Sequence, residues 1–512
     1  MTFSNDIYTS PLAERNASPE MLRLWSPRHK FNTWRRIWLA VAEAQYEVTK
    51  DWPTSKGSPP LVTQEQVDQL RAVVERKNPD GTVGITDAEI ELAKKYEREL
   101  RHDVMSHVHA LGDACPKAKG IIHLGMTSQD VVCNSDLLII NEAADLIVNK
   151  VTRVELSLGS FAQSTSRLPA LGFTHYQPAQ PVTFGRRAAQ WVYDLEVCSA
   201  HLDLRRGSRR IRGLKGATGT QASFLALLDG NHDRVDRLED IVRDKLDELE
   251  WAPHALTTQT YPRVIDTFIL ADLASTAAVL HKIATDIRLL SNRKELDEPF
   301  EDKQIGSSAM PYKRNPMRCE RICGLTRFVM NLVGNAYDTA ATQWLERTLD
   351  DSSNRRLSLP EAFLALDGAL DLMHNVASGM IVHEAMVRKN LMAELPFMAT
   401  ENILMACVKA GGDRQHYHEL IRVHAQAAGM RVKQEGLDND LLERLKNDKN
   451  FWSTARGGPL SAEINWDDLL DPMKYVGRSV EQTERFIREV VDPLREQYAD
   501  AIARLGQSGP RV

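Results

Sequence analysis

Long apolar runs, an excess of positive charge and paired cysteines are all missing from this sequence of 512 residues. No apolar run approaches the roughly 20 residues that a membrane-spanning helix needs, so a membrane protein is not expected. Lys and Arg number 64 against 70 Asp and Glu, a net charge of −6, so no overall positive field would attract nucleic acid or anionic lipid. The six cysteines show no CxxC spacing, and the nearest pair, Cys319 and Cys323, has helical spacing. Reduced thiols are therefore expected. The N-terminus does not resemble a leader sequence, so a cytoplasmic location is expected.

Glycine and proline are also scarce, at 28 and 22 residues, and they cluster. Residues 127–158 contain neither, and apolar residues recur there at steps of three and four from Leu137 to Leu158. Residues 263–298 repeat the pattern from Ile265 to Leu290, which predicts a helix of about 54 Å. Helices this long bury their apolar stripes against other long helices, within one chain or between chains.

Strand signals are rare as well. Period-two alternation is hard to find, and no GxGxxG or GxxxxGK[ST] motif follows a strand, which argues against Rossmann and P-loop folds. The sequence therefore predicts a nearly all-helical protein with a helix near 31–50. Breaks are expected at 52–60, 77–84, 213–219, 304–316 and 452–459. Composition shifts near 127 and 382 predict three parts, 1–127, 128–382 and 383–512.

The segment Gly306–Pro316, GSSAMPYKRNP, is the most unusual stretch and is expected to form a loop. A plain helix connector is the simpler interpretation, because serine, glycine and proline are ordinary turn residues. Alternatively, a loop with two adjacent serines and two cations can bring hydroxyls to a substrate and neutralise its carboxylates.

Histidines gather in two segments. His175 lies in THYQPAQPVTFG, where it is either a structural residue or, if it faces a cleft, a general acid or base. His102, His107 and His109 share the stretch RHDVMSHVH. Their spacing does not match HExxH and no paired cysteines lie near, so a metal site is not favoured.

The segment LERTLDDSSNRR carries Arg347, Ser352, Arg355 and Arg356. Guanidinium groups and a hydroxyl together form a phosphate-type donor set. A solvated charged helix face explains the same residues equally well.

Together these segments resemble a known family. GSSAMPYKRNP is similar to the signature loop of the fumarase/aspartase superfamily. THYQPAQ, LDDSSNRR, ELPFMATENI (394–403), RHDVMSHVH and IIHLGMTSQD (121–130) narrow the resemblance, from about residue 10 to 492, to the adenylosuccinate lyase family. The resemblance implies an all-α, three-domain fold whose central long-helix bundle forms the core of a homotetramer with composite active sites. It implies no cofactor and no metal.

The resemblance also implies a reaction in purine biosynthesis, the β-elimination of fumarate from adenylosuccinate to give AMP and from SAICAR to give AICAR. By this likeness Ser307 is the general base and His175 the general acid. Glu320 orients His175, and Lys313 stabilises the Ser307 alkoxide. Lys313 and Asn315 hold the succinyl carboxylates, since the reaction develops negative charge that cations must offset.

The remaining site residues implied by the resemblance bind the substrate. Thr127 and Ser128 donate hydroxyls to the succinyl group. The residues expected around the phosphate, ribose and base are Arg15, Arg101, His102, Asp103, Gln259, Arg321, Arg347, Ser352 and Arg356. Asn16 departs from the family pattern, in which a tyrosine often follows the arginine.

Three other interpretations compete. Another lyase of the superfamily, such as argininosuccinate lyase, aspartase or a carboxymuconate cycloisomerase, would have no reason to carry LDDSSNRR. A silent structural protein on this scaffold would not need Ser307, His175 and Lys313. Nucleic-acid binding through Arg205–Arg212, RRGSRRIR, is less favoured than a solvated helix face, because the stretch is short and lacks aromatics.

Overall fold

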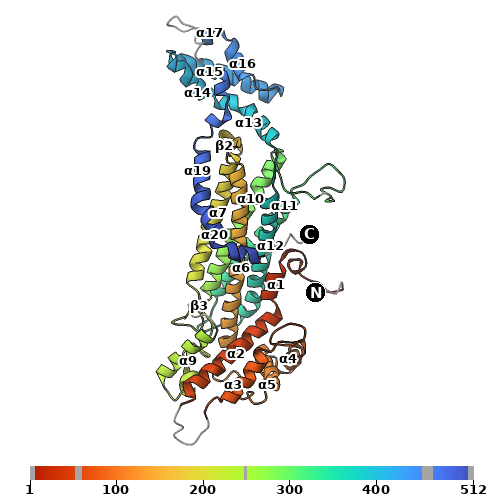
Figure 1. Ribbon diagram of the computed structural model, residues 1–512, viewed down its shortest axis with the longest axis vertical. Helices are drawn as coiled ribbons and strands as arrows, with labels where there is room; N and C mark the ends of the chain where they lie inside the picture. Colours follow the sequence, from red (N-terminus) through yellow and green to blue (C-terminus); the bar gives the residue numbers. More distant parts are fainter. Residues whose placement is uncertain (1–5, 52–59, 247–250, 302, 453–464, 506–512) are drawn as a thin grey trace.

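The computed structural model describes residues 6–51, 60–246, 251–301, 303–452 and 465–505. The molecule is a rod built almost entirely of helices (Figure 1). The predicted breaks at 52–60 and 452–459 fall mostly outside the described residues. All six cysteines are buried and free, as expected for reduced thiols.

Five long helices run along the middle of the rod and enclose the main core (Figure 1). They are α6 (Ser128–Ser164), α7 (Phe184–Gly207), α10 (Val264–Asn292), α11 (Met317–Ala341) and α12 (Asp350–Gly379). The apolar stripes predicted for α6 and α10 are confirmed: Ile147, Leu158, Leu280 and Ile287 are each 0% exposed. At about 1.5 Å per residue, the 37 residues of α6 separate its two ends by roughly 55 Å.

Helix α10 is shorter than the sequence predicted. It ends at Asn292, and Lys294 takes a positive φ of 60°, which breaks a helix that we expected to reach residue 298. By length and composition α10 is apolar enough to cross a membrane, and 39% of its most apolar window is buried. A core helix has the same composition, and the α10 stripe lies in the main core.

The N-terminal helices form a second core at one end of the rod. It is built by α2 (Pro27–Thr49), α3 (Gln64–Val74) and α5 (Asp103–Ala114), and α4 (Asp87–Leu100) packs on α5. The π-helical turn η1 (Leu12–Asn16) and α1 (Pro19–Leu24) instead bury Leu12 and Met21 in the main core. The segment between α7 and α10, with α8 (Ala222–Leu227) and α9 (His232–Lys245), packs against α2 and joins this core.

The C-terminal helices lie at the opposite end around a third core (Figure 1). They are α13 (Glu384–Met398), α14 (Thr400–Lys409), α15 (Arg414–Met430), η2 (Arg431–Glu435), α16 (Leu441–Asn447), α17 (Lys449–Trp452), α18 (Trp466–Leu469) and η4 (Pro472–Lys474). The chain then returns along the central bundle through α19 (Ser479–Phe486), η5 (Ile487–Val491), α20 (Asp492–Gln497) and α21 (Ala499–Arg504).

Short strands form three two-stranded sheets among the described residues. They are β1 (Pro169–Thr174) with β2 (Gln177–Thr183), β3 (Arg210–Ile211) with β4 (Ala252–Pro253), and β5 (Leu296–Asp297) with β6 (Ile381–Val382). The β1–β2 hairpin was not predicted from the sequence. Pro178 and Pro181 lie within β2, and prolines in a short run conceal a strand, because they are depleted from sheets.

Candidate active site

One cluster of predicted residues lies beside the second core, where α4 ends and α5, α6 and α12 begin. It surrounds a cavity of about 760 Å³, which we call the outer cavity. The predicted residues that line it are Arg101, His102, Asp103, Thr127, Ser128, Gln259, Arg347, Ser352 and Arg356. The structure therefore brings together nine side chains from four separate segments of the sequence.

Helix ends place several of these groups. Arg101 follows α4 in the left-handed conformation, with φ 52°. This reversal lets His102 begin α5, where its Nδ1 accepts a hydrogen bond from the Met105 backbone N–H at 3.3 Å. Ser128 opens α6, and its Oγ lies 3.4 Å from His102 Nε2. The hydroxyl and the imidazole thus lie next to each other in the wall of the outer cavity.

Asp103 and Arg356 form an ion pair of 2.7 Å between α5 and α12. Burial raises the pKa of the Asp103 carboxyl, but the hydrogen bond and charge of Arg356 outweigh it, so the pKa lies below its usual range. Arg347 donates to Gln259 Oε1 at 3.0 Å and pairs with Asp351 at 3.2 Å. These contacts hold both guanidinium groups at the cavity wall.

Arg355 does not join this set, contrary to the donor set drawn from the sequence. It points away from the outer cavity and is buried, and it pairs with Asp266 at 2.6 Å and Asp136 at 2.8 Å. Consecutive residues of a helix point about 100° apart, so Arg356 lines the outer cavity while Arg355 does not. Arg355 is a structural residue behind the site.

A second, smaller cavity of about 250 Å³ lies behind the outer cavity, and we call it the inner chamber. Arg347, Ser352 and Arg356 line both spaces. Lys30 and Trp25 also line the inner chamber, and sequence reasoning missed both. No motif marks them, because they lie among ordinary core positions near the start of α2.

His175 lies far from this cluster, at the exposed tip of the β1–β2 hairpin. His175 and Tyr176 have φ of 52° and 57°, the two positive values of a tight two-residue hairpin turn. Gly172 allows the strands to approach, because a Cβ there would lie 2.3 Å from the Gln180 carbonyl oxygen. The hairpin therefore presents His175 at the end of a rigid support.

Ser307 lies in the signature loop between β5 and α11. Its Oγ accepts a hydrogen bond from the Met310 backbone N–H at 3.1 Å. Gly306 is required here, since a Cβ would lie 2.2 Å from the Lys313 carbonyl oxygen. Asn315 donates to the Gly306 carbonyl at 2.8 Å and so closes the loop on itself.

The hairpin and the signature loop share one end of the bundle. Helix α13 packs on β1, and its Asn390 donates to the Arg293 carbonyl just before β5, at 3.2 Å. The outer cavity lies at the opposite end, about one length of α6 away. In one chain, His175 and Ser307 therefore lie toward one end of the bundle, and Thr127 with the cationic set lies toward the other.

Glu320 lies at the start of α11, exposed, 3.9 Å from Arg288. Within the described part of the chain it forms no hydrogen bond or ion pair with His175, and Lys313 forms no hydrogen bond with Ser307. The orienting and stabilising roles expected of Glu320 and Lys313 therefore stay predictions.

Arg15 and Asn16 belong to neither half. Turn η1 docks on the middle of α12, where the Asn16 carbonyl oxygen would lie 2.6 Å from a Cβ on Gly368. The side-chain amide of Asn16 donates a hydrogen bond to the carbonyl of Pro11, just before the same turn, at 2.9 Å. Burial and then the charge of Arg15 lower the pKa of Arg321, so these two arginines lie close together.

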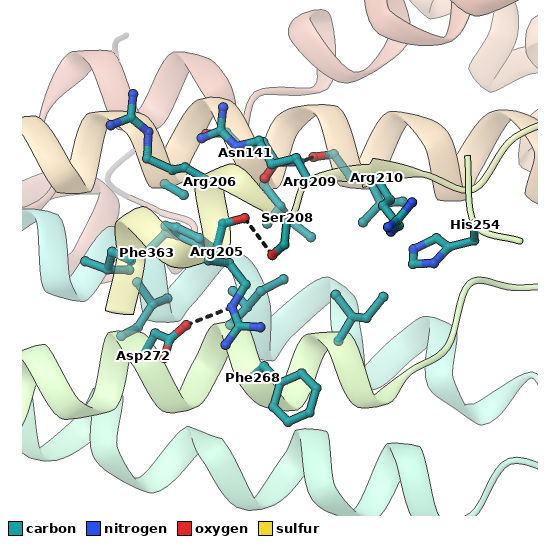
Figure 2. A pocket seen from close by; sticks show the side chains of 17 residues that line it. Asn141, Arg205, Arg206, Ser208, Arg209, Arg210, His254, Phe268, Asp272 and Phe363 are labelled. Carbon is teal, nitrogen blue, oxygen red and sulfur yellow. Dashed lines mark hydrogen bonds and ion pairs between the residues drawn. The ribbon is translucent and has the colours of Figure 1, made fainter. Parts of the chain in front are cut away.

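A further cavity, of about 220 Å³, lies between α6, α7 and α10 and contains no predicted site residue (Figure 2). Arg205 pairs with Asp272 at 3.0 Å at its wall. The stretch 205–212 is not the solvated helix face that we expected: α7 ends at Gly207, and Arg212 is fully buried and paired with Asp130. Arg205 and Arg212 are thus neutralised by aspartates of the same chain.

Comparison with known proteins is consistent with this arrangement. A sequence model described as "Lyase" matches residues 15–331, and one described as "Adenylosuccinate lyase C-terminus" matches residues 396–486. The chain is 47% identical to adenylosuccinate lyase of Saccharomyces cerevisiae, over 95% of both chains. It is 48% identical to that of Schizosaccharomyces pombe, over 94% of this chain and 95% of the relative.

Solved structures share the fold. The 3-carboxy-cis,cis-muconate lactonizing enzyme of Pseudomonas putida has a TM-score of 0.74 at 23% identity, covering 94% of this chain and 99% of that one. A fumarate lyase from Mesorhizobium sp. BNC1 has a TM-score of 0.73 at 22% identity, covering 94% and 100%.

The long-helix bundle and the match over residues 15–331 define an all-α lyase of the fumarase/aspartase superfamily. The identity of 47–48% to the two yeast enzymes, over nearly the full length of the chain, identifies the family within this superfamily. The chain belongs to the adenylosuccinate lyase family and is a carbon–nitrogen lyase.

Proposed function

We propose that this chain cleaves adenylosuccinate to AMP and fumarate, and SAICAR to AICAR and fumarate, in the cytoplasm. The observation that carries the proposal is the outer cavity, in which Arg347, Ser352 and Arg356 offer charged and hydroxyl donors to a phosphate. The close relatives named for this reaction support it. Because these relatives are adenylosuccinate lyases, the two competing interpretations, another lyase of the superfamily and a silent structural protein, are not favoured.

In the proposed reaction, Ser307 removes a proton from the succinyl carbon next to the one that bears nitrogen. The C–N bond breaks, a C=C bond forms to give fumarate, and His175 protonates the leaving nitrogen. Ser307 acts as a base only if its alkoxide is stabilised. The backbone N–H of Met310, which donates a hydrogen bond to Ser307 Oγ, provides part of this stabilisation. Lys313 and Asn315, with Thr127 and Ser128, bind the carboxylates, where negative charge develops. Glu320 orients His175.

The nucleotide part of the substrate binds in the outer cavity. Arg347, Ser352 and Arg356 bind the phosphate and ribose, while Arg101, His102, Asp103 and Gln259 line the rest. Arg15 and Arg321, which are close enough to interact by charge, are assigned to the phosphate end from a second subunit. The Asn16 side chain is turned toward Pro11, so Asn16 contributes through its backbone.

The separation of the two halves supports an oligomer, and the resemblance to the adenylosuccinate lyase family supports four subunits. Residues about 55 Å apart in one chain meet in one site only if different subunits supply them. Exposed apolar residues on α10, namely Val264, Phe268 and Leu289, support a helical interface, since each is at least 38% exposed. In this assembly each chain has three proposed domains, residues 1–127, 128–382 and 383–512. The domain 128–382 forms the core of the tetramer.

The direct test is to incubate the purified protein with adenylosuccinate and follow the loss of its absorbance, with AMP and fumarate measured separately. We expect the two products in equal amounts and none with the Ser307→Ala variant. A wild-type protein that binds AMP yet releases no fumarate from either substrate would refute the proposal.

A further inference from the structure

We propose that Lys30 is an additional phosphate ligand, which reaches the nucleotide phosphate from the inner chamber behind Arg356. This inference rests on the proposed function and deepens it, because it adds a binding residue that neither the motifs nor the resemblance indicates. Lys30 lies in the first turns of α2, and its side chain lines the inner chamber together with Ser352 and Arg356.

The first observation is the pairing of the cations in the chamber. Five line it: Lys30, Arg263, Arg347, Arg355 and Arg356. All four arginines form ion pairs with aspartates, at 2.6 to 3.2 Å. Among the described residues, the Lys30 ammonium has neither a hydrogen bond nor an ion pair. Asp136, Asp103 and, after them, Glu97 attract it by charge. Asp136 and Asp103 each already bind an arginine, and Glu97 lines the outer cavity but not the chamber.

The second observation is what surrounds the ammonium. Lys30 Nζ lies 4.9 Å from the centre of the Trp34 ring and 5.6 Å from that of Phe31. Trp34 is fully buried, so these rings replace much of the water that an ammonium normally binds. Burial, and after it the charge of Arg356, lowers the pKa of Lys30. A cation in such surroundings is poorly compensated until an anion reaches it.

The third observation is the charge balance. The chamber lining holds five cations and two carboxylates, Asp136 and Asp351, so its own charge is positive. Asp103 and Asp266 pair with arginines from outside the lining, which leaves Lys30 as the cation of this set without a paired carboxylate. A nucleotide monophosphate carries close to two negative charges at neutral pH. Because Ser352 and Arg356 line both cavities, a phosphate held by them from the outer cavity has Lys30 on its inner side.

The test uses the full-length oligomer and measures binding by calorimetry, with inorganic phosphate, AMP and adenosine as probes. In Lys30→Met, which keeps the apolar stem on Trp34, we expect the Kd for phosphate and for AMP to rise about tenfold or more, with adenosine unchanged. Lys30→Arg keeps the charge and should recover most of the affinity. Lys94→Met is the matched control, because Lys94 is exposed on α4 and, among the described residues, pairs only with Glu91. This variant should bind all three probes as the wild type does.

A second measurement needs no variant. Limited acetylation of the wild-type protein, read by mass spectrometry, should modify Lys30 less when inorganic phosphate is present, while Lys94 is modified equally with and without it. Equal affinity of Lys30→Met and the wild type for phosphate, or equal acetylation of Lys30 in both conditions, overturns the assignment. A lower melting temperature with unchanged affinity also overturns it and leaves Lys30 as a support for Trp34. Binding needs no turnover, so a wild type that binds AMP but does not cleave adenylosuccinate refutes only the proposed function.

Discussion

Glu155 should make the stability of this protein depend on pH. It is 0% exposed at the contact between α6 and α7, where Oε1 accepts a hydrogen bond from Ser199 at 2.9 Å. Among the described residues, Oε2 has no hydrogen-bond partner. Burial raises the pKa of Glu155 from 4.5 to about 7, against the effect of Ser199 and with a further rise from the charges of Glu196 and Asp203.

The sign of the effect follows from proton binding. Between pH 4.5 and 7 the folded protein holds a proton on Glu155 that the unfolded chain has released, so stability falls as pH rises through this window. The shift corresponds to about 3 kcal/mol lost per chain by pH 8. For a chain of this length, 1 kcal/mol changes the melting temperature by about 1 °C, so the expected loss is about 3 °C.

The assay is scanning calorimetry at pH 5 and pH 8, at one protein concentration, on the wild type and Glu155→Gln. Glutamine keeps the size and the bond to Ser199 but cannot ionise, so the variant should lose about 3 °C less than the wild type between the two pH values. Glu496→Gln, at an exposed glutamate, is the control and should follow the wild type. Equal pH dependence in Glu155→Gln and the wild type would show that Glu155 is ionised in the folded protein and would refute the reasoning.

The other predictions concern the site. Ser307→Ala and His175→Gln should each lower kcat by several orders of magnitude while AMP still binds, because both act mainly in the transition state; near-normal turnover of either variant would remove that assignment. Arg347→Ala and Arg356→Ala should raise KM and weaken AMP binding about tenfold or more, since charged hydrogen bonds contribute about 1.5–3 kcal/mol each. An unchanged affinity for AMP would exclude that arginine as a phosphate ligand.

The sequence was most informative where one physical pattern dominates. The stripes of α6 and α10 predicted two long buried helices because a single apolar period runs through each. The end of α10 was missed, because the positive φ of Lys294 depends on tertiary contacts and no glycine or proline marks it. The hairpin that carries His175 was missed for the opposite reason, because its prolines conceal the strand pattern.

For the site, too, the sequence indicated what depends on local motifs and missed what depends on the folded arrangement. The motifs indicated which side chains belong to the cavity, and the structure gathers nine of them around the outer cavity. They could not show that Arg355 turns inward, since that depends on the helix face of α12. Lys30 could not be found either, because its role depends on which neighbouring aspartates already bind arginines, and only the folded arrangement shows this.

We propose that the two halves of each site come from different chains, and mixed oligomers provide the test. Ser307→Ala removes the base from one half, and a double variant, Arg347→Ala with Arg356→Ala, removes the phosphate ligands from the other. If the halves come from different subunits, denaturing and reassembling the two inactive proteins together should restore activity in about a quarter of the sites. Simple mixing of the folded, non-exchanging proteins should restore none. Hybrids confirmed by mass that stay as inactive as their parents would mean that one chain supplies both halves, and would contradict the account.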